Sequence, residues 1–410
     1  EGPVMKTSRL AGKADTYLRK LCLDIPHRRL GSQGNRQATD FFAQWIASLG
    51  LGVHRQEFDC LDWTHGTVRL AVDGEPFAVM ISPYSLGCRV TAPLIVASAL
   101  DELEALDAQD KILLLRGELA KEQLVPKNYP FYGSERHQRI VHLLESGNPS
   151  AIIGATSRNP ATTAALYPFP LIEDGDFNIP AVHMTDVEGD RLAAHAGRAA
   201  TLVIEATRIP SQGCNVVARC GPDVGPRVIV CAHIDTKEGT PGALDNAAGI
   251  TTLLLLAELL QDYGGRLSIE IVAFNGEDDY SAAGEIEYLL RSGESFHDIK
   301  LGINLDAMGY CQGKTAYTLY GCPEEMAAAI RGTFSSREGL VEGDPWYQSD
   351  HSLFIQQQVP AMAITSERFT ELSAQVSHTA KDRPQLVDRS RLVNVALVLR
   401  DLLRELDNIL

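Results

Sequence analysis

The sequence predicts an α/β protein with a mostly parallel, twisted sheet covered by helices on both faces, together with an inserted β-rich α+β domain. The first reason is size, because 410 residues exceed the length at which a single hydrophobic core usually stops growing. The second is that short apolar runs alternate with helical patterns after Pro210. The third is that residues 67–204 show short strands and frequent turns instead of this alternation.

The N-terminal part is expected to be helical and then extended. Residues 8–49 read as helical, with apolar side chains at helical spacing from Ala38 onward. The sequence Gly50-Leu-Gly ends this pattern, and residues 53–59 are typical of a strand.

The inserted region should contain strands at 111–117 and 151–155 and one helix at 137–146. Its composition changes near residue 67 and again near residue 205. The predicted domains are therefore 5–66 together with 205–410, and the insertion 67–204.

The C-terminal half alternates buried strands with helices. The strand at 228–232 is apolar throughout, as expected for a strand with both faces covered, and the helix at 247–260 is rich in leucine. In such sheets, ligands collect at the carboxyl ends of the strands, so polar residues that follow the strands are candidates for a site. The other expected elements are strands at 267–274, 301–305 and 360–364 and helices at 281–290 and 389–406.

The net charge of −16 argues against two classes of partner. Nucleic acids and anionic membranes are bound through clustered Lys and Arg, which a chain this acidic does not favour. The longest apolar run, at 253–260, is interrupted by Glu258 and is far too short to span a bilayer. We therefore expect no nucleic-acid and no membrane partner, and the oligomeric state is left open.

The eight cysteines are scattered and include no CxxC pair, which is typical of reduced thiols in a chain of this length. Met5 follows Glu1–Val4, which resembles a tag remnant ahead of a native start, and no apolar signal stretch comes next. These features predict a cytoplasmic protein. An exported form is the alternative if Glu1 is a processed terminus.

Ligand-type side chains follow each of the central strands. Taken singly, each is an ordinary cap or loop residue. Carboxylates and imidazoles that arrive together at one edge of a sheet instead predict a site for divalent metal ions. In chain order these residues are His233, Asp235, Asp245, Glu277, Asp278, Asp306 and His378.

As a set, these residues resemble the co-catalytic zinc peptidases of metallopeptidase family twenty-eight. That family includes bacterial aminopeptidases, glutamate carboxypeptidase and the non-catalytic transferrin receptor. The resemblance covers about 205–410 and the N-terminal helical stretch through 29–35, and it implies the zinc-aminopeptidase (phosphorylase/hydrolase-like) fold. The matching segments are His233-Ile-Asp235, Gly242–Gly249, Phe274–Asp278, Asn304-Leu-Asp306, Ser349–Phe354 and His378–Asp382.

The resemblance implies two zinc ions per chain. Asp245 would bridge both ions with one carboxylate oxygen to each. His233 and Asp306 would complete one zinc site, and Asp278 and His378 would complete the other. Manganese and cobalt are the possible substitutes, because sites rich in carboxylates are not strongly selective.

Two further roles follow from the same resemblance. Asp235 would accept the second ring N–H of His233 and so fix its tautomer. Glu277 would take a proton from the bridging water and return it to the leaving amine. The small residues Ala243 and 247–249 would let the helix start lie close against the metal site.

Two of the predicted ligands have rivals. The family commonly has Glu-Glu where this chain has Glu277-Asp278, and Asp279 follows immediately. In an extended segment, neighbouring side chains point to opposite faces, which favours Asp278 over Asp279. His351 is the alternative to His378, since zinc accepts an imidazole from either position.

Tyr347 is a candidate for an oxyanion-hole role, because a tyrosine near the active site of relatives hydrogen-bonds the tetrahedral intermediate. Packing beside Trp346 is the alternative interpretation. The resemblance also implies that Asp350 and His351 are structural. The link between Asp235 and Asp245 is shorter than in many relatives, which removes loop material from around the cleft.

Within the insertion, residues 110–117, 144–154 and 179–185 resemble the protease-associated domain found inside many of these enzymes. The whole pattern predicts a zinc aminopeptidase that acts on peptide substrates. One alternative is a dipeptidase or carboxypeptidase with the same site. Another is a receptor-like scaffold without catalysis, although such relatives lose ligands that this chain retains.

Overall fold

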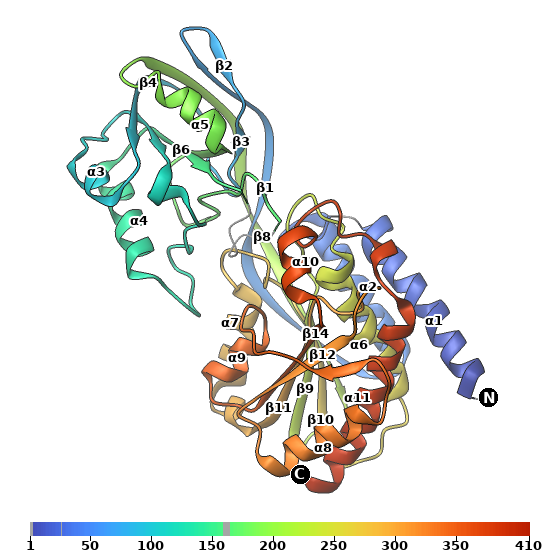
Figure 1. Cartoon of the computed structure of the whole chain (residues 1–410). Helices are drawn as coiled ribbons and strands as arrows, with labels where there is room; N and C mark the ends of the chain where they lie inside the picture. Colours follow the sequence, from blue (N-terminus) through green and yellow to red (C-terminus); the bar gives the residue numbers. More distant parts are fainter. Residues whose placement is uncertain (1–2, 26, 159–164) are drawn as a thin grey trace. The chain divides into compact units, whose positions relative to one another are not determined.

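A computed structural model describes residues 3–25, 27–158 and 165–410, which form two compact units (Figure 1). The first unit comprises Glu1–Cys60 and Gln212–Leu410, and the second comprises Leu61–Ser211. Two long strands, β1 (Gly52–Val72) and β8 (Ala199–Cys220), contribute residues to both units.

The sheet of the first unit has four parallel strands at its centre. Their order is β10 (Ser268–Phe274), β9 (Arg227–His233), β11 (Ile299–Leu305) and β14 (Ala361–Ser366). Antiparallel β8 flanks β10, and antiparallel β12 (Thr315–Tyr320) flanks β14 and pairs in turn with β13 (Leu340–Glu342). Every residue of β10 and β14 is buried, which accounts for their apolar sequences. The predicted, mostly parallel sheet is thus confirmed.

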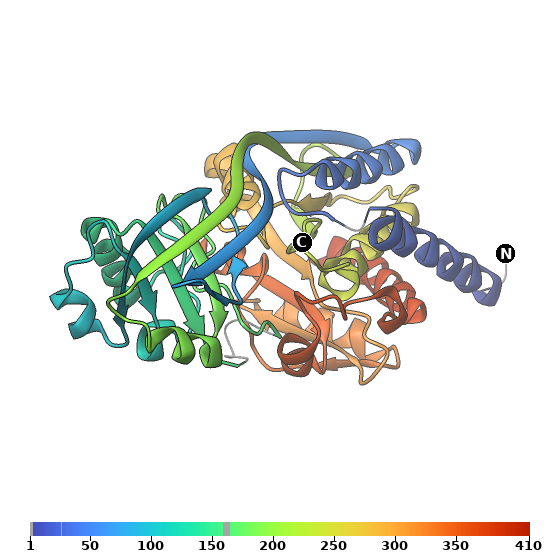
Figure 2. The same ribbon diagram turned by 90° about the horizontal axis from the view of Figure 1, so that it is seen from above.

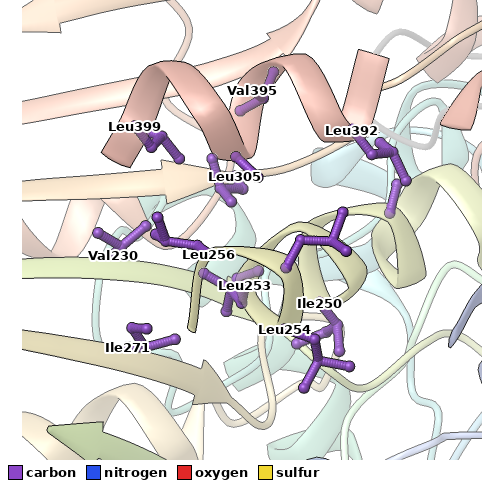
Figure 3. Close-up of a cluster of buried hydrophobic side chains, with 14 of the residues drawn as sticks. Val230, Ile250, Leu253, Leu254, Leu256, Ile271, Leu305, Leu392, Val395 and Leu399 are labelled. Carbon is purple, nitrogen blue, oxygen red and sulfur yellow. The ribbon is translucent and has the colours of Figure 1, made fainter. Parts of the chain in front are cut away.

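One face of this sheet carries the main hydrophobic core. Figure 3 shows Val230 and Ile271 of the strands facing Leu253 and Leu256 of α6, with Leu399 of α11 in the same cluster. These side chains are all fully buried, so they exclude water from the layer beneath the strands. The helices of this face are α1 (Pro3–Arg19), α2 (Gln33–Ser48), α6 (Ala248–Leu259), α8 (Glu324–Ser335) and α11 (Arg389–Ile409).

The opposite face is covered by α7 (Ala283–Ser292) and α9 (His351–Gln356). A Cβ at Gly302 would lie 2.5 Å from the ring of Phe354 in α9, so glycine is what lets this helix approach β11. Phe354 stacks on Phe296, and Tyr288 of α7 packs edge-on against Phe274. Helices therefore cover both faces, as predicted.

The N-terminal helical region differs from the prediction, because it is two helices and not one continuous stretch. Helix α1 ends at Arg19 and passes into a short π-helical turn, Lys20–Asp24. Helix α2 begins after Ser32, whose Oγ accepts a hydrogen bond from the backbone N–H of Asn35 at 3.1 Å. Residues 27–32, which precede α2, form a loop that includes Gly31 with φ +80°.

The second unit contains its own sheet. Strands β4 to β7 are parallel neighbours, with β8 antiparallel on one side and β3 antiparallel on the other. The strand and helix predicted around 151–155 and 137–146 are β6 and α4. That the unit is a protease-associated domain stays a prediction. Its elements are β2 (Glu75–Phe77), β3 (Met80–Ile81), β4 (Cys88–Ala97), α3 (Leu100–Ala105), β5 (Ile112–Leu115), α4 (Glu135–Gly147), β6 (Ala151–Thr156), β7 (Ala181–Thr185) and α5 (Asp186–Ala193).

All eight cysteines lie in the described part of the chain and are free thiols. Burial raises the pKa of Cys220 to about 12 and that of Cys22 to about 11, so both stay protonated near neutral pH. Among the described residues, no helix combines the length and the apolar character that crossing a membrane requires.

Candidate metal centre

The predicted ligands meet because the carboxyl ends of three neighbouring parallel strands reach the same edge of the sheet. Figure 2 shows the same ribbon from above. The register pairs Phe274 of β10 with His233 of β9, and Asn304 of β11 with Cys231 of β9. Continuing the second pairing by two residues brings Asp306 level with His233. The segment that follows β10 reaches the same edge.

Five side chains form two overlapping clusters. In the first, Nε2 of His233 lies 3.1 Å from Oδ1 of Asp245 and 3.6 Å from Oδ1 of Asp306. In the second, Nε2 of His378 lies 3.2 Å from Oδ2 of Asp245 and 3.0 Å from Oδ1 of Asp278. Within each cluster the candidate ligand atoms lie within 4.8 Å of one another. Asp245 thus presents one carboxylate oxygen to each histidine.

Two atoms of the first cluster lack well-directed hydrogen bonds. Among the described residues, neither Nε2 of His233 nor Oδ1 of Asp306 has a hydrogen-bond partner, although both atoms are buried. Buried polar atoms are nearly always satisfied, so two such ligand-type atoms 3.6 Å apart fit a metal ion. Imidazole nitrogens together with carboxylate oxygens are a donor set that zinc accepts.

The charges of the site also suit cations. Burial by itself lowers the pKa of His233, but the carboxylate of Glu277 and the neighbouring aspartates outweigh it, and the pKa lies well above its usual value. The pKa of His378 is raised in the same way, with Asp278 as the main opposing charge. Closely spaced buried carboxylates repel one another, and a bound divalent cation would be the largest compensating charge.

Glu277 lies beside the clusters. Its Oε2 is 3.8 Å from Nε2 of His233, and its side chain is 20% exposed, against 4% for Asp278. Burial raises the pKa of Glu277 well above its usual range. The nearby charges of Asp278 and Asp306 raise this pKa further, whereas His233 lowers it. A carboxylate in such surroundings can both accept and return a proton.

The start of α6 holds Asp245 close to the strands. The side-chain amide of Asn246 donates to the carbonyl of Leu305 at 2.7 Å, and its oxygen accepts from the backbone N–H of Gly249 at 3.0 Å. A Cβ at Gly249 would lie 2.7 Å from the Leu305 carbonyl and 2.9 Å from Cβ of Ala232. The expected close packing of this helix start is therefore found.

Asp235 makes more contacts than the sequence indicated. Nδ1 of His233 lies 3.2 Å from the backbone carbonyl of Asp235 and 3.6 Å from its carboxylate, so the carbonyl is the nearer acceptor. The two carboxylate oxygens accept the backbone N–H groups of Gly276 and Asp278, at 2.9 and 3.0 Å. Asp235 therefore fixes both the imidazole and the segment that carries Glu277.

The two rival ligands lie outside these clusters. Oδ2 of Asp279 accepts hydrogen bonds from the backbone N–H and the hydroxyl of Ser281, at 3.1 and 2.5 Å. Nε2 of His351 lies 2.8 Å from the carbonyl of Trp346, so Nε2 carries the hydrogen, and burial lowers the pKa of this imidazole to about 4. His351 is a neutral, buried side chain bound to the backbone. The geometry thus favours Asp278 and His378.

Tyr347 is 56% exposed, and its ring centroid lies 5.4 Å from that of Tyr320. Its packing partner is therefore a different aromatic residue from Trp346, the neighbour considered in the sequence. An oxyanion-hole role for Tyr347 stays a prediction.

A buried acidic pair was not foreseen. Glu285 of α7 and Asp350, just before α9, are both buried, and they lie close enough for the charge of Glu285 to raise the pKa of Asp350. Burial raises the pKa of Glu285 to about 7 and that of Asp350 well above its usual value. Two neighbouring buried carboxyl groups cannot both ionise cheaply, so one of them tends to keep its proton. Single acidic residues at a helix start and a loop gave no sequence signal for this pair.

Comparison with known proteins shows what the chain is similar to. Residues 215–403 match peptidase family M28. The chain is 33% identical over 138 residues to the uncharacterised protein YfbL of Escherichia coli, which covers 31% of this chain and 43% of that protein. It is 24% identical over 401 residues to aminopeptidase YwaD of Bacillus subtilis, covering 93% and 82% of the two chains. The chain thus spans less than half the length of the Escherichia coli relative.

Solved structures extend the likeness to the fold. An aminopeptidase from Aneurinibacillus sp. strain AM-1 superposes with a TM-score of 0.76 and 22% identity, covering 97% of this chain and 94% of that chain. A zinc aminopeptidase from Bacillus subtilis gives a TM-score of 0.75 and 21% identity, covering 97% and 95%.

Proposed function

Residues 215–403 match peptidase family M28, and on this premise we propose that the chain is a zinc-dependent aminopeptidase that removes the N-terminal residue of a peptide. The observation that carries the proposal is the pair of clusters that share Asp245, because each offers one imidazole and two carboxylates to a single ion. The relatives named as aminopeptidases support an aminopeptidase over a dipeptidase or a carboxypeptidase.

The ligand assignment follows the two clusters. His233, Asp245 and Asp306 would hold one zinc ion, and Asp245, Asp278 and His378 would hold the second. When bound, the two ions would supply an acidified water and polarise the scissile carbonyl.

Glu277 is the proposed general base and acid. It is close enough to the first cluster to reach a water there, and its partial exposure gives it access to the substrate. It would accept a proton from the attacking water and deliver that proton to the leaving amine. Asp235 would keep Glu277 in place through the N–H groups of Gly276 and Asp278. Tyr347 is the candidate donor to the developing oxyanion.

The test is hydrolysis of matched substrates by zinc-loaded protein whose metal content has been measured. We expect release of p-nitroaniline from some members of a panel of aminoacyl p-nitroanilides, and none from their N-acetylated counterparts. Equal cleavage of blocked and free substrates would rule out recognition of a free N-terminus. Cleavage confined to dipeptides, or to the C-terminal residue of blocked peptides, would select the other exopeptidase classes. A zinc-loaded chain that cleaves none of these substrates would contradict the proposal.

A further inference from the structure

Two buried charged side chains outside the proposed ligand set hold the loop that links two of the ligands. This loop, called here the metal loop, comprises residues 234–244 and joins His233 to Asp245. Arg28 contacts its carbonyl groups, and Asp382 contacts its N–H groups.

Arg28 binds both ends of the metal loop. Its Nε donates to the carbonyl of Ile234 at 3.0 Å, and its two terminal nitrogens donate to the carbonyls of Pro241 and Gly242 at 3.0 and 2.9 Å. A fourth bond, of 2.6 Å, goes to the carbonyl of Leu21 outside the loop. The side chain is 1% exposed. Only a guanidinium offers enough donors in one rigid plane to span these carbonyls, because an ammonium has three donors at a single atom.

The loop sequence makes room for this guanidinium. Gly242 has φ +57°, a left-handed conformation that glycine adopts without a penalty. A Cβ at this position would lie 2.9 Å from a terminal nitrogen of Arg28 and 2.3 Å from Cγ2 of Thr236. The close approach of Arg28 to the backbone therefore depends on glycine.

Asp382 holds the C-terminal end of the metal loop. Its Oδ1 accepts the backbone N–H of Leu244 at 2.8 Å, and its Oδ2 accepts that of Asp245 at 3.0 Å. Its own carbonyl accepts the N–H of Ala243 at 3.3 Å. The Asp382 side chain is fully buried, so these two hydrogen bonds take the place of its hydration. The backbone of Asp245 is thus fixed immediately beside the carboxylate that faces both histidines.

We propose that Arg28 and Asp382 are positioning residues of the metal centre, which set the separation and orientation of His233 and Asp245 through the metal loop. The inference rests on the proposed zinc site. The guanidinium donors on the loop carbonyls and the carboxyl oxygens on the loop N–H groups keep these peptide groups from rotating. Both side chains bind the backbone of the metal loop and neither bonds a proposed ligand side chain, so the pair acts through geometry.

Metal affinity is the direct readout, since it needs no substrate. Apo protein is titrated with zinc in competition with a chromophoric chelator, and with cobalt while its visible absorption is followed. Removal of a residue that orients a ligand typically weakens metal affinity about ten- to a hundredfold. We expect Arg28→Met to weaken zinc affinity by this factor and to change the intensity of the cobalt bands. The zinc affinity of Arg28→Lys should lie between those of Arg28→Met and the wild type.

The matched control is Arg227→Met. Arg227 lies at the opposite end of β9 from His233 and also bonds a carbonyl, that of Ser295, at 2.7 Å. We expect this variant to lose thermal stability and to keep the wild-type zinc affinity and cobalt spectrum. That contrast separates positioning of the ligands from a general loss of stability.

If Arg28→Met does not fold, Arg28→Lys and Asp382→Asn carry the test. The asparagine has the same size and one acceptor oxygen in place of two, so it too should weaken zinc binding. Folded variants at both positions with wild-type zinc affinity and cobalt spectrum would overturn the inference. Absence of zinc binding by the wild-type chain would instead overturn the proposed function, so the two failures are distinguishable.

Discussion

His378 and Asp278 are in direct contact, with Nε2 of the histidine 3.0 Å from Oδ1 of the aspartate. The contact joins the loop after α10 (Phe369–Gln375) to the segment after β10, which are far apart in the sequence. It is the contact that decides between the candidate imidazoles, because His351 is bound to a backbone carbonyl instead.

The first prediction separates these two histidines. His378→Ala should lower the bound zinc from two ions to about one per chain and should abolish most of the activity, because the second cluster loses its only imidazole. His351→Ala should keep both ions and lose thermal stability, since it removes a buried, hydrogen-bonded side chain. Elemental analysis and thermal melts check both. Two ions in the His378 variant together with one in the His351 variant would reverse the assignment.

The second prediction concerns proton transfer. Glu277→Gln keeps the size of the side chain and removes its capacity to accept a proton, so kcat should fall about a hundredfold to ten-thousandfold while zinc content is unchanged. Asp279→Asn is the control, because Asp279 is bound to Ser281. It should keep near wild-type kcat. Near-normal turnover by the glutamine variant would show that another group is the base.

Asp235 gives the third prediction. Asparagine at this position has one acceptor oxygen, whereas the structure uses both carboxylate oxygens for the N–H groups of Gly276 and Asp278. Asp235→Asn should therefore weaken zinc affinity or activity about ten- to a hundredfold, as expected for a residue that orients a ligand. Chelator competition and steady-state kinetics measure the two effects. A variant that equals the wild type in both measurements would show that the backbone carbonyl of Asp235 is enough to orient His233 without the carboxylate.

The fourth prediction is a pH dependence of stability. Burial raises the pKa of Glu285 to about 7 from 4.5, so the folded state favours the protonated acid. The resulting stabilisation is complete below about pH 4.5 and is lost as the pH rises through about 7. Glu285→Gln stays neutral, so relative to the wild type it should gain about 1–3 kcal/mol in free energy of unfolding between pH 5 and 8.

Urea unfolding at several pH values measures this difference. Glu294→Gln, at an exposed position, should show a difference from the wild type that is nearly independent of pH. A Glu285→Gln curve parallel to that of the wild type would mean that the acidic pair does not exchange a proton in this range.

The sequence predicted the parts of the fold and the site that depend on local patterns. Apolar strands predicted the positions of β9, β10, β11 and β14, and the residues that follow the first three supplied most of the proposed ligands. The clusters that Asp245 forms with His233 and His378 were expected for two reasons. One was the order of the ligand-type residues along the chain, and the other was the family resemblance.

The remaining features depend on contacts between distant segments. Arg28 lies in a loop with no helical or strand pattern, and its role exists only because the metal loop folds over it. Asp235 also fixes the segment that carries Glu277, and this requires the segment after β10 to present two N–H groups to the carboxylate of Asp235. Strand β13 was missed because three partly exposed residues carry almost no periodicity. Helix α8 was missed because only part of its surface is buried, which weakens its apolar pattern.

The spread of the proposed ligands along the chain has a consequence for biosynthesis. They follow β9, β10, β11 and α10, and parallel strands bring such distant segments together late and slowly. A nascent chain cannot assemble the first cluster until residue 306 has left the ribosome, nor the second until residue 378 has done so, and an unfolded chain offers no preformed chelate. An ion at the second cluster would therefore be acquired only by an almost completed fold, and recovery of activity after denaturation should follow the rate of chain folding at any saturating zinc concentration.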